Sequence, residues 1–128
     1  FDSQQYHNLN HPIVLPEGRL GPLIKDQLKG LEILDYGLAL EEDSFIIGSN
    51  GCRLQWPLAA AYALAMVTQA GASKISLVGF DGFSADDPRQ EEMNDVFLKY
   101  TSLAEGLAIT ALTPSTYRID QSSVFSPI

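Results

Sequence analysis

The stretch KISLVGFDG at residues 74–82 gives the clearest indication of the fold. Its apolar run, residues 75–80, is typical of a strand that is covered on both faces, as strands in parallel sheets are. Asp81 and Gly82 come next, so we expect the strand to end in a tight polar loop. A helix should follow, because Asp87-Pro88-Arg89-Gln90 offers an N-cap, a proline at the first helical position and the glutamine of a capping box.

Apolar patterns elsewhere in the chain predict further strands and helices in alternation. We expect strands at residues 13–15, 33–40, 45–47, 75–80 and 107–112, and helices at residues 20–31, 55–70 and from 88 to a stop at Gly106. This order predicts an α/β fold, three-layered and Rossmann-like, with a mostly parallel sheet and helices on both faces. We expect residues 13–128 to form a single α/β domain and residues 1–12 a polar arm or linker.

The composition argues against several classes of partner. The chain has 16 acidic and 8 basic residues and a net charge of -8, so it lacks a broad basic surface for a nucleic-acid backbone or for anionic lipid. No apolar run reaches the ~20 residues that a membrane helix needs. Nothing resembles a signal peptide. We therefore expect a soluble, cytoplasmic protein that binds neither nucleic acid nor membranes.

The N-terminal residues and the single cysteine limit cofactor chemistry. The chain opens with Phe1 rather than Met, so we expect it to be a fragment of a larger protein. Cys52 is the one cysteine, which rules out an intrachain disulfide and a cysteine-rich metal site. His7 and His11 have a metal-ligand spacing for a helix, but Pro12 argues against helix there. We expect no metal site and no cofactor in this fragment.

Polar residues gather where three of the predicted strands end. These ends read GSNG at residues 48–51, GFDGF at 79–83 and TPST at 113–116. In open parallel sheets, ligands bind outside the carboxyl ends of the strands. We therefore expect a ligand crevice at this edge of the sheet and assign no catalytic residue. The candidate ligand-binding residues are Ser49, Asn50, Asp81, Gly82, Arg89, Thr113 and Ser115.

The first four of these candidates also have simpler structural interpretations. Asp81 could bind ribose hydroxyls, hold a metal-bound phosphate or act as a base. It could equally fix its loop as an Asx-turn, with Gly82 at a positive φ. Ser49 and Asn50 are expected to precede the helix at residues 55–70, where they could bind an anion or simply cap the helix.

Arg89 and Cys52 have open alternatives as well. Arg89 could clamp a phosphate or carboxylate bidentately, or it could pair with Asp86 or Asp87 on the surface. Cys52 could be a nucleophile, but no histidine in the body of the fold could activate it, so a buried structural thiol is the favoured interpretation. Tyr117 could cover the crevice or simply pack.

Residues 45–125 resemble the C-terminal domain of bacterial aldolases similar to 4-hydroxy-2-oxovalerate aldolase and hydroxymethylglutaryl-CoA lyase. The motifs behind this resemblance are GFDG at residues 79–82, DPRQEEM at 87–93 and LTPSTY at 112–117. These aldolases are often associated with surface-polysaccharide genes. Their activity belongs to a metal-dependent barrel that this chain does not contain, so the resemblance implies a companion domain, with a divalent metal in the missing barrel.

A more distant resemblance is to the Rossmann-like domain of bacterial sialyltransferases and their motility-associated relatives. It rests on an alanine-rich helix, the glycine-alanine turn at residues 71–72 and the strand that ends in Gly79-Phe80-Asp81. In that family the same segment binds a sugar nucleotide. Those enzymes use a histidine base beyond this strand, whereas no histidine occurs after His11 here.

Three functional hypotheses follow. The leading one is an accessory or ligand-binding domain of an aldolase-type enzyme in carbohydrate metabolism, with a crevice for a sugar nucleotide or phosphorylated small molecule. The second is a sialyltransferase-like glycosyltransferase that uses Asp81. The third is a structural module that forms a homodimer or docks the barrel domain of the same chain. We expect the fragment not to be catalytic on its own.

Overall fold

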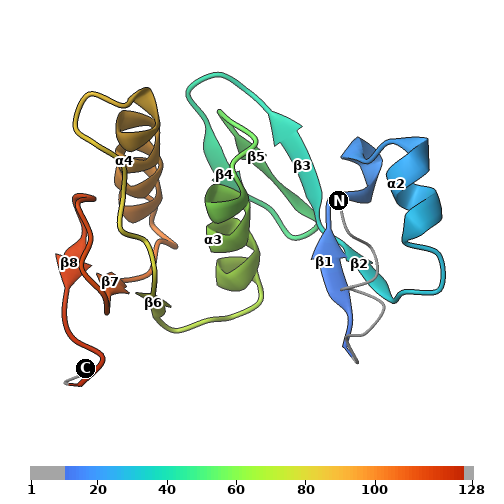
Figure 1. Ribbon diagram of the computed structural model, residues 1–128. Helices are drawn as coiled ribbons and strands as arrows, with labels where there is room; N and C mark the ends of the chain where they lie inside the picture. The colour runs from blue at the N-terminus through green and yellow to red at the C-terminus, as the bar shows by residue number, and fades with distance from the viewer. Residues whose placement is uncertain (1–10, 126–128) are drawn as a thin grey trace. The chain divides into compact units, whose positions relative to one another are not determined.

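The computed structural model describes residues 11–125 (Figure 1). The chain divides into two compact units, and the division falls between Met66 and Val67. Each unit is described by itself below. The arm predicted at residues 1–12 lies almost wholly outside the described residues, as does His7.

The first unit begins with a β-α-β crossover. Strand β1 (Ile13–Leu15) is followed by the short helix η1 (Glu17–Arg19) and by α2 (Pro22–Gln27), and β2 (Ile33–Asp35) then runs parallel to β1. The helix predicted at residues 20–31 is therefore present but shorter at both ends. It starts at a proline, which is favourable in the first turn, and the chain leaves the helix in turns before Gly30, whose φ is +85°.

The strand predicted at residues 33–40 is extended throughout but changes its partner at Tyr36. The Tyr36 N–H donates to the carbonyl of Leu15 at 3.3 Å, whereas the Gly37 N–H donates to the carbonyl of Asn50 at 2.8 Å. The segment therefore forms two strands, β2 and then β3 (Gly37–Leu40). Because successive N–H groups of a strand point to opposite edges, the two partners lie on opposite sides of this segment.

A β-hairpin lies where we expected a strand and a loop leading to the helix at residues 55–70. Strand β4 (Phe45–Ile47) pairs antiparallel with β5 (Gly51–Leu54), which in turn pairs parallel with β3. Strand β5 was not predicted. The helix that follows, α3 (Ala59–Gln69), starts later than expected because Pro57 disfavours helical backbone at the residue before it.

The second unit holds a small parallel sheet and one long helix. Strands β6 (Ile75–Leu77), β7 (Ile109–Ala111) and β8 (Asp120–Gln121) lie in the order β6-β7-β8, and α4 (Pro88–Thr101) connects the first two (Figure 1). The strands predicted at residues 75–80 and 107–112 are present but shorter. The expectation that the first of them is covered on both faces is wrong, because Ile75 and Leu77 are only half-buried and Ser76 is exposed. Gly79 explains the early end of β6, because its φ of +79° turns the chain out of the strand. Strand β8 was not predicted.

The apolar stripe of α4 forms the core of this unit. Met93, Val96, Phe97 and Tyr100 are all buried. The Tyr100 hydroxyl lies 2.6 Å from the Thr68 hydroxyl and accepts a hydrogen bond from the Leu107 N–H at 3.0 Å, so this buried polar atom is satisfied. On the same helix, Asp95 and Lys99 form an ion pair at 2.6 Å, at the i, i+4 spacing. The helix ends at Thr101, and turns carry the chain on to Gly106.

The α/β class is therefore confirmed, whereas the expected single sheet is not observed. Within the described residues, the strands form separate small sheets, β1-β2, β3-β5-β4 and β6-β7-β8, rather than one three-layered Rossmann-like sheet. Between residues 11 and 125, no helix combines the length and the apolar character required to cross a bilayer.

Candidate ligand-binding site

Two of the three predicted polar strand ends lie side by side in the second unit. Because β6 and β7 are parallel neighbours, with Leu77 opposite Ala111, the loops that leave their carboxyl ends start at the same edge. The Leu112 N–H donates to the Leu77 carbonyl at 2.8 Å, and the Gly79 N–H donates to Thr113 Oγ1 at 2.8 Å. The Thr113 hydroxyl therefore links the loop after β7 to the loop after β6 by a hydrogen bond.

Asp81 is held by its main chain and not by its carboxylate. Its carbonyl oxygen accepts hydrogen bonds from the Thr116 N–H at 2.8 Å and from the Thr116 hydroxyl at 3.0 Å. The side chain is exposed and makes no hydrogen bond or ion pair within residues 11–125. An Asx-turn, the structural alternative for Asp81, therefore does not fix this loop. The carboxylate is available to a ligand.

Gly82 stands where the two loops come closest. Its φ is +100°, a conformation that side-chain-bearing residues rarely adopt. A Cβ atom at this position would meet the Thr116 hydroxyl oxygen at 2.0 Å and Gln90 Oε1 at 3.0 Å. Gly82 thus has a packing role as well as the positive φ that the sequence predicted.

Gln90 is the site residue whose role the sequence did not reveal. Its side chain is 5% exposed, and its Oε1 accepts from the Phe83 N–H at 2.8 Å while its Nε2 donates to the Thr116 carbonyl at 3.0 Å. The predicted capping box is therefore only half formed: Asp87 caps the helix, but Gln90 bonds to the loops instead of to the Asp87 N–H. A usable signal was that Gln90 and Asn94 lie at helical spacing on the apolar stripe of α4.

Asn94 fixes the same loop one helical turn further along α4. It is buried, and its Oδ1 accepts from the Arg118 N–H at 2.8 Å. The guanidinium of Arg118 pairs with Glu91 at 2.9 Å on the surface. Two buried amides on one helix face therefore hold the main chain of the loop after β7, which keeps the loop in one conformation.

Arg89 pairs with Asp87, which is one of the two alternatives that the sequence left open for it. Its Nε and Nη2 donate to the two carboxylate oxygens of Asp87 at 3.1 and 2.7 Å, and its main-chain N–H donates to the same carboxylate at 2.9 Å. These hydrogen bonds hold the pKa of Asp87 below its ordinary value and the pKa of Arg89 above its ordinary value. Both groups stay charged at neutral pH.

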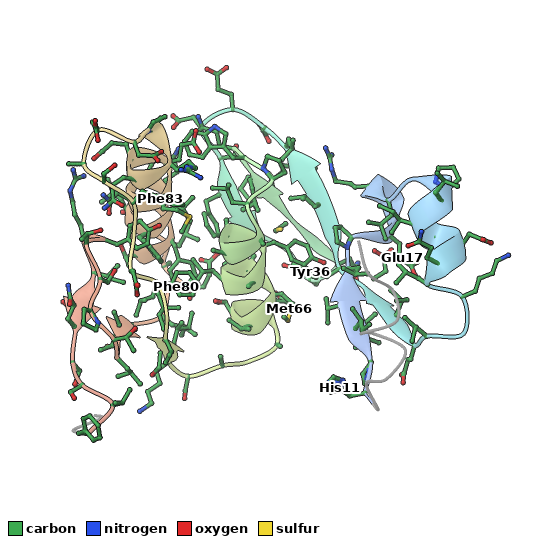
Figure 2. The ribbon with its side chains drawn as sticks, in the orientation of Figure 1. His11, Glu17, Tyr36, Met66, Phe80 and Phe83 are labelled. Atoms are coloured by element: carbon green, nitrogen blue, oxygen red, sulfur yellow. The ribbon has the colours of Figure 1, made fainter. Side chains whose placement is uncertain are left out.

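The guanidinium of Arg89 also lies over the ring of Phe83, 4.1 Å from its centre. Figure 2 shows Phe83 on the loop that leads into α4. A cation over an aromatic face is stabilised by the ring quadrupole. Arg89 is therefore held on two sides, while Nη1 makes no hydrogen bond within the described residues and is open to an anion.

Ser115 and Tyr117 are used inside the loop after β7. The Ser115 hydroxyl accepts from the Tyr117 N–H at 3.2 Å, and the Ser115 carbonyl accepts from the Gln121 side chain at 2.6 Å. Tyr117 is buried, with its ring 5.4 Å from that of Phe97, so it packs into the core of the unit. Burial is also the main reason why the pKa of Tyr117 is raised.

Ser49 and Asn50 lie in the first unit and do not precede a helix. They form the turn between β4 and β5, which the Gly48 N–H closes by donating to the Gly51 carbonyl at 2.9 Å. The interpretation of these residues as a helix cap or as an anion site at a helix N-terminus is therefore wrong. The intervening strand β5 separates them from α3.

Cys52 is a buried structural thiol, as the sequence favoured. It is 6% exposed on β5, and burial raises its pKa to about 11. Near it, the Tyr36 hydroxyl donates to the Gly48 carbonyl at 2.9 Å, and the Tyr62 hydroxyl donates to the Tyr36 carbonyl. The thiol is protonated at neutral pH, so it is a poor nucleophile.

Within residues 11–125, histidine, cysteine, aspartate and glutamate side chains do not gather in threes that could hold a metal ion. Comparison of the chain with protein-family models, with curated proteins and with solved structures gives no match. The geometry of the second unit therefore carries the functional argument.

Proposed function

We propose that residues 67–128 form a ligand-binding module for a small molecule that carries hydroxyl groups and a negative charge, such as a sugar nucleotide or another phosphorylated sugar. The observation that carries this proposal is the state of Asp81. Two hydrogen bonds from Thr116 fix its main chain, while its exposed carboxylate has no partner within the described residues.

The chemistry of the site suits a hydroxylated ligand. A carboxylate accepts two hydrogen bonds from neighbouring hydroxyls of a ribose or hexose, and these charge-assisted bonds are stronger than neutral ones. The loop that carries Asp81 is already ordered by Gln90 and Thr116. A ligand would therefore meet an acceptor that loses little conformational freedom on binding.

Arg89 supplies the positive charge for such a ligand. Its guanidinium is positioned by Asp87 and Phe83 before any ligand arrives, and its Nη1 donors remain open. Phosphate and carboxylate groups are the usual partners of a guanidinium with free donors. A phosphorylated sugar requires an acceptor for its hydroxyl groups and a donor for its phosphate, and Asp81 on the loop after β6 and Arg89 in the first turn of α4 offer these.

The wider role that we propose is an accessory domain of an aldolase-type enzyme in carbohydrate or surface-polysaccharide metabolism. The GFDG, DPRQEEM and LTPSTY motifs that suggest this role all fall in the loops and helix of the candidate site. The parallel strands joined by α4 are the Rossmann-like feature of this unit. In this role the barrel domain of the parent enzyme performs the chemistry, and a divalent metal belongs to that barrel.

The test is a titration of the ¹⁵N-labelled chain with CMP- and UDP-sugars, followed by NMR. We expect shifts at the amides of Asp81, Gly82 and Thr116, and loss of these shifts in Asp81→Asn. Asp86→Asn is the matched control, because Asp86 is an exposed aspartate of the same loop. Absence of any shift at millimolar ligand, or equal weakening by both variants, would overturn the proposal.

The free carboxylate of Asp81 also favours a second candidate, a glycosyltransferase in which this residue is the base. The same samples distinguish the two functions. Release of free nucleotide or transfer of the sugar, abolished in Asp81→Asn, would indicate the transferase. Binding without turnover of any donor would indicate the ligand-binding module.

A further inference from the structure

A cavity lies in the first unit and shares no residue with the candidate site. It has a volume of about 400 Å³ and is lined by η1, α2 and the segment that leads into β2. This volume is within the ~300–1,000 Å³ range of small-molecule pockets. Its apolar lining consists of Leu20, Leu28, Leu31 and Ile33.

The charged lining of this cavity is basic in an acidic chain. Lys25 of α2 and Lys29, which follows that helix, line it, and so does Glu17 of η1. Figure 2 labels Glu17. Residues 17–33, which span the lining, hold three basic and three acidic side chains, whereas the whole chain has a net charge of -8. Because two lysines and one glutamate line the cavity itself, it attracts an anion more than the rest of the chain does.

The basic side chains beside this cavity form no ion pair or only a solvent-exposed one. Arg19 and Lys25 form no hydrogen bond or ion pair through their side chains within residues 11–125. Lys29 pairs with Asp26 at 2.8 Å, but their side chains are 79% and 69% exposed, so water screens that pair and it holds the ammonium only weakly. The ammonium groups of Lys25 and Lys29 can both turn to a ligand.

We infer that this cavity binds the carboxylate of a small aliphatic acid. The hydrocarbon part of the acid lies on Leu28, Leu31 and Ile33, and its carboxylate is bound by Lys25 and Lys29. Glu17 repels a second negative charge, so a monocarboxylate binds better than a phosphate monoester, which carries close to two charges at neutral pH. This site does not depend on the role proposed for the second unit.

Three compounds of the same shape test the inference by NMR titration of the ¹⁵N-labelled chain. They are 4-methylpentanoate, the uncharged 4-methylpentan-1-ol and the dianionic 3-methylbutyl phosphate. We expect 4-methylpentanoate to shift the amides of Leu28, Gly30 and Leu31, with the other two compounds about tenfold weaker, as expected for a lost or opposed charge-assisted hydrogen bond. Equal binding of the alcohol, tighter binding of the phosphate, or no shift at concentrations on the order of 10 mM would overturn it.

A pair of charge-matched variants locates the site. Lys25→Gln should weaken 4-methylpentanoate binding roughly three- to tenfold. Arg53→Gln removes the same charge from the same unit, but its side chain is on β5 and pairs with Glu41 at 3.1 Å. It should leave binding unchanged. If both variants weaken binding equally, the effect is one of overall charge and the inference fails.

Discussion

The side-chain amide of Gln90 donates a hydrogen bond to the main-chain carbonyl of Thr116 at 3.0 Å, which joins the first turn of α4 to the loop after β7. The same side chain accepts from the Phe83 N–H at 2.8 Å. One buried residue thus organises both loops of the candidate site. Removal of a polar group that is buried in this way lowers the stability of the fold by more than its net hydrogen-bond energy, because its former partners stay buried without a hydrogen bond.

Gln90→Glu should therefore destabilise the fold, although it changes few atoms. A carboxylate can still accept from Phe83, but it cannot donate to the Thr116 carbonyl, and it places a buried charge beside that oxygen. We expect a loss of about 1–3 kcal/mol in the free energy of unfolding, measured with urea. Gln69→Glu makes the same chemical change at an exposed position and should alter stability by about 0.5 kcal/mol or less. Equal losses in the two variants would contradict the bridging role of Gln90.

Gly82→Ala and Gly71→Ala separate backbone strain from steric conflict. Both glycines have a positive φ, +100° and +97°, so an alanine at either position costs roughly 1–2 kcal/mol of backbone strain. A Cβ at Gly71 meets no atom within 4 Å, whereas one at Gly82 meets the Thr116 hydroxyl at 2.0 Å. Thermal or urea unfolding should show Gly82→Ala to be worse by a further ~1–3 kcal/mol. A Gly82→Ala variant no less stable than Gly71→Ala would show that the loops are not closely packed.

Asp81→Asn and Thr116→Val should differ in their effects on stability. The exposed Asp81 carboxylate has no partner within the described residues, so its replacement should change stability by about 0.5 kcal/mol or less. Thr116→Val keeps the side-chain shape but loses the hydrogen bond to the Asp81 carbonyl, which should cost about 1 kcal/mol. Chemical denaturation measures both. A strongly destabilised Asp81→Asn would indicate a structural role for the carboxylate.

The buried thiol of Cys52 should make the stability of the chain fall at alkaline pH. Its pKa is raised to about 11 in the fold, compared with about 8.5 for an exposed thiol. The protonated form is therefore favoured by folding, and this contribution is complete below about pH 8.5 and is lost as the pH rises through the folded value, to an extent on the order of 2 kcal/mol. Urea unfolding between about pH 8 and pH 11 measures the loss.

Cys52→Ala is the control for this pH dependence. Burial also raises the pKa of Tyr62 to about 12, and that contribution stays in the variant. The difference between the two pH profiles therefore reports the thiol together with its smaller electrostatic effect on Tyr62 and Tyr36, whose pKa values a Cys52 thiolate raises. Parallel profiles would show that the Cys52 thiol is not desolvated by the fold.

The local elements of the second unit could be predicted because short-range signals decide them. Asp87, Pro88 and the stripe from Met93 to Tyr100 specify α4 without reference to the rest of the chain. The prediction failed for β5, because Gly51-Cys52-Arg53-Leu54 has no strong strand signal of its own. That segment is a strand because β3 and β4 pair with its two edges. Pairing partners distant in sequence override weak local preference.

The segment at residues 74–82, as a sequence, determined a strand followed by a polar loop that holds Asp81 and Gly82, but it did not determine the burial of that strand, because Ser76 and Val78 are exposed. Apolar continuity and loop chemistry are local properties, so they can be read residue by residue. Only the tertiary structure decided which neighbours meet that loop. It brought Thr113, Thr116 and Gln90 to it, and it left Ser49 and Asn50 in a hairpin turn of the other unit. The physical reason is that parallel strand pairing and buried side-chain hydrogen bonds join residues far apart in the chain. The sequence around one such residue does not indicate which distant residue it will contact.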